Sequence, residues 1–467
     1  MNFLHHGTYG TYTTHRTYLT GMMLSCNNAQ GRPRQAEACR WISPRADARI
    51  IVVLLLCLHV PNGSSFAVEL WSDDEGHQGT LDVAGKITSL TSDPPDDPML
   101  YPEGTTQTTL ARLRLGLNIK HSDEMDSQFA YEQRARWTSD GVGVSAVGSL
   151  LPSGAEMPFR ITQLDWEICE HNDDFAYRHE IDRAFVAFHP EWGEVSVGRQ
   201  AIGLGRGVLF SAVDLFAPFS PLEVDREWRR GVDAARAEYR LSDTSSAELI
   251  SVFGETWEQS AVLGRIRGYA GDVDGSFIFG KYTEDFLVAG VVSAIVSEAE
   301  VHAELAVFDT PDEHPDGTLW GGDDVVTKAV FGTSYTFDIG NGLTVLAEYH
   351  YSDFGVEDAE DALARLANPD FQQRFLRGDT QILGRQALAT QLSYTFNDAL
   401  GGTFLVLTNP TDGSGVLSPS LRLDMAENIT LIGSAFIGWG DEPSGGQLQS
   451  EYGATATSLF LQANVYY

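Results

Sequence analysis

The chain has 467 residues, enough for several soluble domains or one large sheet. Its 31 Lys and Arg stand against 65 Asp and Glu, a formal net charge of -34, which argues against nucleic acid as a partner because phosphate binding needs a positive surface. Only four of the cations are lysines, so nearly all positive charge is guanidinium, the group suited to bidentate recognition of carboxylates and phosphates.

The N-terminal region has the parts of a secretory signal peptide. Arg45 and Arg49 precede an apolar run at 50–60, and the small-x-small site SFA ends at Ala67. The run is well short of the ~20 apolar residues that a helical membrane span needs. We therefore predict export and cleavage near Ala67.

Residues 1–48 are long for the start of a signal peptide, so translation from Met22 or Met23 is the alternative interpretation. Removal of 1–67 leaves Cys169 as the single cysteine, which excludes an internal disulfide. A large exported chain without disulfides needs another source of stability, and a closed barrel supplies one.

Downstream, polar and apolar residues alternate in segments of about ten residues, as in strands with one polar and one apolar face. In 112–120, Leu113, Leu115, Leu117 and Ile119 share one face. We predict strands at 80–90, 107–120, 126–138, 178–189, 193–203, 230–241, 245–256, 260–270, 272–282, 285–295, 299–309, 326–337, 342–353, 385–396, 400–408, 414–425, 428–439 and 456–467. The stretch 138–177 is either a long loop or hides two short strands, and sixteen strands is the alternative total.

The connections alternate between short polar turns and longer segments such as 203–230, 310–324, 354–384 and 439–455. Short turns at one end and long loops at the other are typical of outer-membrane barrels. The last strand places Leu459, Leu461, Ala463, Val465 and the terminal Tyr467 on one face, which resembles the C-terminal signature of bacterial outer-membrane barrels.

These features predict an all-β fold, a transmembrane antiparallel up-and-down β-barrel of about 18 strands with long external loops. We divide the chain into a leader at 1–67, a short periplasmic segment at 68–79 and the barrel at 80–467. An 18-strand barrel encloses an aqueous channel rather than a packed core.

If the apolar face of each strand meets lipid, the opposite face lines the lumen and carries mostly arginine. The predicted pore wall comprises Arg112, Arg114, Arg134, Arg136, Arg236, Arg265, Arg267, Glu348, Arg385 and Arg422. Such a wall either selects anions through its positive field or pairs with carboxylates and stiffens the barrel. Strands 272–282 and 285–295 are apolar on both faces, so their inward face is left unassigned.

The segment 203–230 is the third external connection, rich in arginine and without a hydrophobic period. In porin-type channels, which the mature chain resembles, the third external loop folds inward. Leu209-Phe210 and the apolar run 215–219 would anchor it to the wall. The predicted constriction comprises Arg199, Gln200, Arg206, Asp214, Asp225, Arg226, Arg229 and Arg230. The alternative is a loop whose Arg–Asp pairs merely hold it down. A short amphipathic helix at 356–366 would lie over or inside the mouth.

The run 193–221 is similar to alginate-export-type and related carbohydrate-channel barrels, in which a GRQ at a strand end leads into a loop containing Gly and Asp. The matching positions are Gly198, Arg199, Gln200, Gly205, Arg206 and Asp214. The resemblance implies passive export or diffusion of an anionic or sugar-like solute through an Arg-lined pore.

No GxSxG, HExxH or phosphate-binding loop occurs, and no acidic stretch has the spacing of a calcium loop, so we predict no enzyme, cofactor or metal. We predict a channel for small or linear hydrophilic solutes in the outer membrane of a Gram-negative-type bacterium, as a monomer or trimer. Its other partners would be outer-membrane lipid and the barrel-assembly machinery. The alternatives are a polysaccharide export channel and a structural or adhesive barrel with a closed lumen.

Overall fold

The structure is a computed structural model that describes residues 68–102, 104–139, 157–171, 174–311, 314, 316–322 and 324–467, without the side chains of 167–171. The chain divides into two units, 1–50 and 51–467, and every described residue belongs to the second. The leader and cleavage site predicted in 1–67 therefore lie outside the described residues. Within the described ranges, no helix is both long and apolar enough to cross a membrane.

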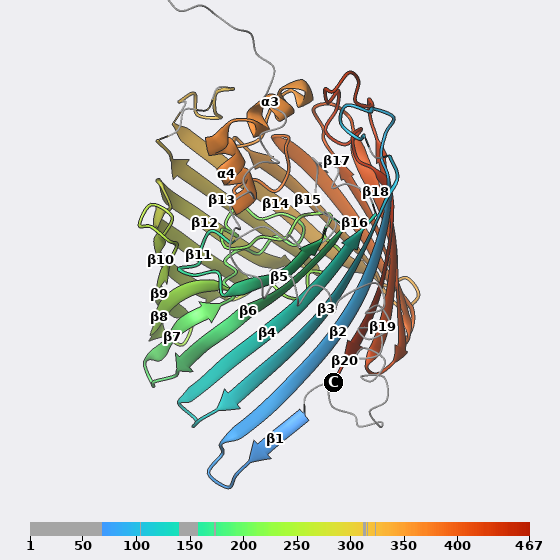
Figure 1. The fold of residues 1–467 in the computed structure, drawn as a ribbon. Coiled ribbons are helices and arrows are strands. Elements are labelled where there is room, and N and C mark those ends of the chain that lie inside the picture. Colours follow the sequence, from blue (N-terminus) through green and yellow to red (C-terminus); the bar gives the residue numbers. More distant parts are fainter. Residues whose placement is uncertain are drawn as a thin grey trace, which may run out of the picture. The chain divides into compact units, whose positions relative to one another are not determined.

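Among the described residues, twenty strands form one antiparallel sheet, and eighteen of them close into a barrel because β2 pairs with β20 (Figure 1). The barrel strands are β2 (Gln78–Asp93), β3 (Thr106–Lys120), β4 (Met125–Thr138), β6 (Phe175–Phe188), β7 (Gly193–Gln200), β8 (Val232–Ser242), β9 (Ser245–Val252), β10 (Ala261–Ala270), β11 (Val273–Tyr282), β12 (Asp285–Val296), β13 (Ala299–Asp309), β14 (Val325–Phe337), β15 (Leu343–Ser352), β16 (Gln386–Asn397), β17 (Leu400–Thr408), β18 (Gly415–Ala426), β19 (Ile429–Trp439) and β20 (Thr457–Tyr466). The predicted fold class is confirmed.

Two further strands extend the wall locally. β1 (Val68–Ser72) pairs with the first residues of β2. β5 (Asp165–His171) pairs with β6 from Phe175 to Glu180, whereas β7 pairs with β6 only from Ala184 to Phe188. β5 therefore continues the wall where β7 has already ended. The stretch 138–177, which the sequence left open, contributes this one short strand among its described residues.

The eighteen predicted strands correspond to the barrel strands, with ends that shift by a few residues. The largest shift is at β9, which ends at Val252 instead of 256, and β7 ends at Gln200 instead of 203. Gly198 in β7 has φ +124°, a conformation open to glycine, and a Cβ there would meet the Ala184 carbonyl at 2.2 Å. The chain leaves the wall two residues later.

Strand alternation places apolar side chains on the outside of the barrel, as a surface facing lipid requires. In β12, Phe286 and Val288 are 52% and 38% exposed on that outer face. Leu287, Ala289 and Val291 point inward and are at most 6% exposed. Both faces of this strand are apolar because its inner face packs against protein inside the barrel.

The short connections lie at one end of the barrel, together with β1 and the C-terminus, and the long connections lie at the other (Figure 1). The β15–β16 connection holds a 3-10 turn, η3 (Ala359–Asp361), followed by α3 (Ala362–Leu366) and α4 (Pro369–Arg377). The helix predicted at 356–366 corresponds to η3 and α3. Sequence reasoning missed α4. Asn368 caps its N-terminus by accepting from the Asp370 and Phe371 N–H groups, and Gly378, with φ +93°, follows its last residue, Arg377.

Candidate pore lumen

Residues 201–231, which connect β7 to β8, lie inside the barrel, and we call them the strap (Figure 1). Leu209, Phe210 and Phe216 in the strap are at most 5% exposed. The ring of Phe216 lies 6.1 Å from that of Tyr282 in β11, and Phe210 stacks on His350 of β15 at 5.0 Å between ring centroids. The apolar part of the strap is thus packed on the inner face of the β8–β15 wall, as its composition predicted.

Two wall carboxylates hold the strap at its tip, residues 206–213. Glu304 of β13 accepts hydrogen bonds from the Arg206 and Gly207 N–H groups at 2.5 and 2.8 Å with one oxygen. Its other oxygen accepts from the Ser211 hydroxyl and the Ala212 N–H, both at 2.7 Å. Hydrogen bonds to ionised acceptors are the stronger class, so Glu304 is a main anchor of the tip.

Glu348 of β15 is the second anchor. It accepts from the N–H groups of Val208, Leu209 and Phe210 at 2.6, 2.8 and 3.0 Å, and also contacts His302 Nε2 at 3.0 Å. The sequence placed Glu348 on the pore wall, and its carboxylate is taken up by these donors. It is 1% exposed, so it is buried by the strap.

Glycine at two positions lets the backbone come this close to the wall. A Cβ on Gly205 would lie 2.1 Å from the Ser211 hydroxyl and 2.8 Å from a Glu304 oxygen. A Cβ on Gly207 would lie 1.8 Å from the Phe210 carbonyl oxygen. The Gly-Arg-Gly sequence thus leaves Arg206 as the one side chain that projects from this turn.

The other end of the strap contacts the opposite part of the wall. Asp225 accepts from Lys86 of β2 at 2.6 Å and from Arg112 of β3 at 2.9 Å. The Trp228 ring lies 3.9 Å from the Lys86 ammonium and 5.0 Å from the Arg114 guanidinium, within the range of cation–π attraction. Because its two ends bind β13–β15 and β2–β3, the strap crosses the lumen.

A continuous ion-pair network lies between the strap and the wall of β2 to β6. Among the described residues, seven cations contact five carboxylates in this network. The cations are Lys86, Arg112, Arg114, Arg134, Arg160, Arg183 and Arg230, and the carboxylates are Glu132, Glu180, Asp182, Asp225 and Glu227. Sequence reasoning missed Lys86, Arg160 and Asp182, although Lys86 lies on the polar face of a predicted strand.

Most residues of the predicted constriction are engaged by other protein groups. Arg199 is 2% exposed and binds Asp233 at 2.7 Å, and Gln200 is 4% exposed. Arg226 donates to the carbonyls of Ser220, Pro221, Glu223 and Val208, and Arg229 binds Asp214 at 2.5 Å. Arg206 differs, because half of its side chain is exposed beside Asp274, 3.0 Å away. A role for this set in contacting a solute stays a prediction, with Arg206 placed best for it.

The predicted wall arginines divide into two groups. Arg112, Arg114 and Arg134 are at most 9% exposed within the network, whereas Arg136 is exposed. The other arginines bond outside this network. Arg236 and Arg265 form ion pairs with Glu248, Arg267 with Glu238 at 2.7 Å, and Arg422 with Asp424 at 3.1 Å. Arg385 donates to the Gly317 carbonyl at 2.7 Å. Pairing, one of the two expected roles, is therefore widespread among these arginines.

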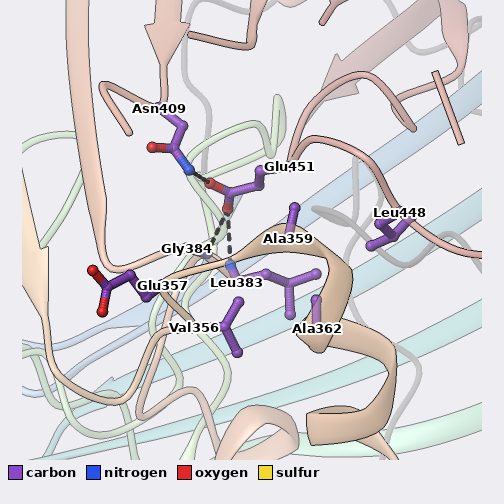
Figure 2. A pocket seen from close by; sticks show the side chains of 9 residues that line it. All are labelled: Val356, Glu357, Ala359, Ala362, Leu383, Gly384, Asn409, Leu448 and Glu451. Atoms are coloured by element: carbon purple, nitrogen blue, oxygen red, sulfur yellow. Dashed lines mark hydrogen bonds between the residues drawn. The ribbon is translucent and has the colours of Figure 1, made fainter. Parts of the chain in front are cut away.

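A buried carboxylate also ties the long connections together (Figure 2). Glu451 accepts from the N–H groups of Leu383 and Gly384 at 3.0 and 2.9 Å and from the Asn409 amide at 2.8 Å, so it joins three loops. A cavity of about 10 Å³, roughly the room for one water, lies beside it, lined also by Val356. Burial raises the pKa of Glu451 to about 7 against the opposing effect of these hydrogen bonds.

The described residues contain no group of three or more His, Cys, Asp or Glu side chains arranged to hold a metal ion. The prediction of no cofactor stays a prediction. Sequence analysis did not anticipate the two strap anchors: it placed Glu348 on the pore wall without assigning it the N–H groups of the strap as donors, and it gave no role to Glu304.

No protein-family model matches this chain, and no curated protein sequence matches it either. Among solved structures, it is similar to OccAB1 of Acinetobacter baumannii, at 9% identity and TM-score 0.49 over 83% of this chain and 96% of that one. It is also similar to the outer membrane protein opdK of Pseudomonas aeruginosa, at 8% identity and TM-score 0.45 over 83% and 98%.

A third similar structure is OmpF of Salmonella typhi in complex with daunomycin, at 11% identity and TM-score 0.44 over 86% of this chain and 100% of that one. Because all three TM-scores are below 0.5, we base the fold on the strand pairing alone. The local resemblance of 193–221 to alginate-export-type barrels stays a prediction.

Proposed function

We propose that this protein is a passive channel for small hydrophilic solutes in the outer membrane of a Gram-negative-type bacterium. The observation that carries the proposal is the closed 18-strand wall with an apolar outside and a charged inside. Barrels of this size enclose a lumen wide enough for water and solutes. The alternation of short turns and long loops supports placement with the long loops outside the cell.

The strap would narrow this passage, because it crosses the lumen and is bonded to the wall at both ends. Arg206 projects from the strap tip with half its side chain exposed, so a passing solute would contact it. The half-exposed guanidinium of Arg206 supports a preference for anionic or sugar-like solutes over cations, since charged groups in a pore select ions of the opposite sign.

A second candidate is a barrel whose strap closes the lumen, leaving a structural or adhesive role for its outer surface. The burial of Phe210 and Phe216 to 1% and 0% exposure favours this candidate, because a tightly packed strap leaves less open section. Export of a linear polysaccharide, which the resemblance of 193–221 implied, remains within the channel proposal.

The test is the reversal potential of the purified protein in planar bilayers under a salt gradient. We expect anions to permeate better than cations, and Arg206→Ala to reduce that preference by removing an exposed lumen charge. Asp358→Ala, a change in the β15–β16 connection, is the matched control and should leave the reversal potential unchanged. A preference for cations, or equal shifts from both variants, would reject the assignment of Arg206 to the passage.

A further inference from the structure

Polar side chains without partners gather at one place on the inner wall. Lys328 of β14 is 1% exposed, and neither a hydrogen bond nor an ion pair to its ammonium occurs among the described residues. His350 and Ser352 of β15 are 0% exposed, and both nitrogens of His350 and the hydroxyl of Ser352 lack partners. Buried polar groups are nearly always bonded, so three together require an explanation.

The strand register brings these three groups to one face of the wall. Lys328 lies directly opposite Ser352 in the β14–β15 pairing, and His350 lies opposite Val330, two positions further along the same inner face. Phe210 of the strap covers His350 with its ring, and Gln381 of the β15–β16 connection accepts from the neighbouring Ser211 N–H at 2.9 Å. The strap and an outer loop thus enclose the cluster.

The carboxylates that act electrostatically on Lys328 are already committed to other donors. Glu304 accepts from the strap tip, Asp214 pairs with Arg229 at 2.5 Å, and Asp379 accepts from Tyr282 at 2.7 Å as well as from two arginines. A buried ammonium without a bonded counter-charge is costly, and water supplies no charge to offset it.

We propose that Lys328, His350 and Ser352 form a binding site for a small inorganic anion of the size of chloride. An ammonium, an imidazole N–H and a hydroxyl are all donors, so together they suit an acceptor that carries negative charge. The bound anion would lie beneath Phe210 and beside His350, which is two residues from the Glu348 anchor in β15. It would stabilise the contact between the strap and the wall. The site is independent of whether the barrel conducts.

The test is crystallography of the full-length protein with bromide in place of chloride. We expect one anomalous bromide peak within hydrogen-bonding distance of the Lys328 ammonium and the Ser352 hydroxyl, and its loss in Lys328→Met. Lys281→Met is the matched control, because Lys281 is already bonded to the Trp257 and Ser260 carbonyls at 2.7 and 2.9 Å. An ordered water without an anomalous signal, bromide only at the surface, or a peak that persists in Lys328→Met would overturn the proposal.

A second measurement, which uses only the wild-type protein, tests the site even if Lys328→Met does not fold. The thermal midpoint of the wild-type protein is compared in chloride and in gluconate, an anion too large for an enclosed site, at equal ionic strength. Stabilisation that saturates with chloride is expected, since a ligand that binds only the folded state raises its stability. An identical midpoint in both salts would contradict the anion site.

Discussion

Removing the Glu304 carboxylate should release the tip of the strap. The residue receives three strong bonds from backbone N–H groups, those of Arg206, Gly207 and Ala212, and one from the Ser211 hydroxyl. A hydrogen bond to a charged group contributes about 1.5–3 kcal/mol. If only the Gly207 and Ala212 bonds are counted, Glu304→Ala lowers the free energy that holds the strap tip against the wall by about 3–6 kcal/mol, because these N–H groups lose their acceptor.

Hydrogen–deuterium exchange measures this loss directly. If the tip opens locally, a cost of about 3 kcal/mol raises exchange of the Gly207 and Ala212 amides by about 100-fold, since 1.4 kcal/mol is a factor of ten. Glu298→Ala is the control, because Glu298 lies in the turn between β12 and β13 and its carboxylate accepts from the Tyr335 hydroxyl and not from the strap. Equal exchange in the two variants would refute the anchoring role of Glu304.

Two further predictions concern the strap core and the loop tie. Phe216→Ala removes a ring that is 0% exposed and should lower the free energy of unfolding by about 3–5 kcal/mol in denaturant titrations. Val208→Ala, at a 53% exposed site, should change it little, and similar losses would contradict the packing described. Burial raises the pKa of Glu451 to about 7 from an ordinary 4.5, so the carboxyl group holds a proton in the folded loops that it releases when the loops open. The stability that Glu451 gives to the folded loops is therefore full below about pH 4.5 and falls by about 3 kcal/mol as the pH rises through 7. Exchange at Leu383 and Gly384, corrected for intrinsic rate, should show this slope, and Glu451→Gln should flatten it; an equal slope in both would exclude Glu451 as its source.

The barrel could be predicted from the sequence because each strand is specified by a pattern within its own residues. Alternation such as that of Leu113, Leu115 and Leu117 specifies a strand without reference to its neighbours. Where this alternation is absent, the sequence did not predict the structure. The strand β5 was missed because it lies in a stretch without alternation. The inner face of β12 was left unassigned because it is apolar too, and it is apolar because the strap covers it. The inward course of the strap was anticipated from its apolar runs and its position in the chain.

The bonding of the strap could not be predicted, because its partners come from distant strands. Glu304 lies about a hundred residues from the N–H groups it accepts from, and Lys86 lies 139 residues from Asp225. Composition places arginines and carboxylates in the lumen, whereas which of them pair depends on a path of the strap that no local pattern encodes. The exposed Arg206 and the buried Arg199 therefore look alike in the sequence.

The central claim is that the strap narrows a conducting lumen. Single-channel recording in planar bilayers tests it most directly, with the wild-type protein compared with Glu304→Ala in the same salt. We expect discrete current steps from the wild-type protein and larger steps once the tip is released. Absence of current from both proteins would contradict the channel, and equal step sizes from both, with exchange showing the tip released, would contradict the strap as its constriction.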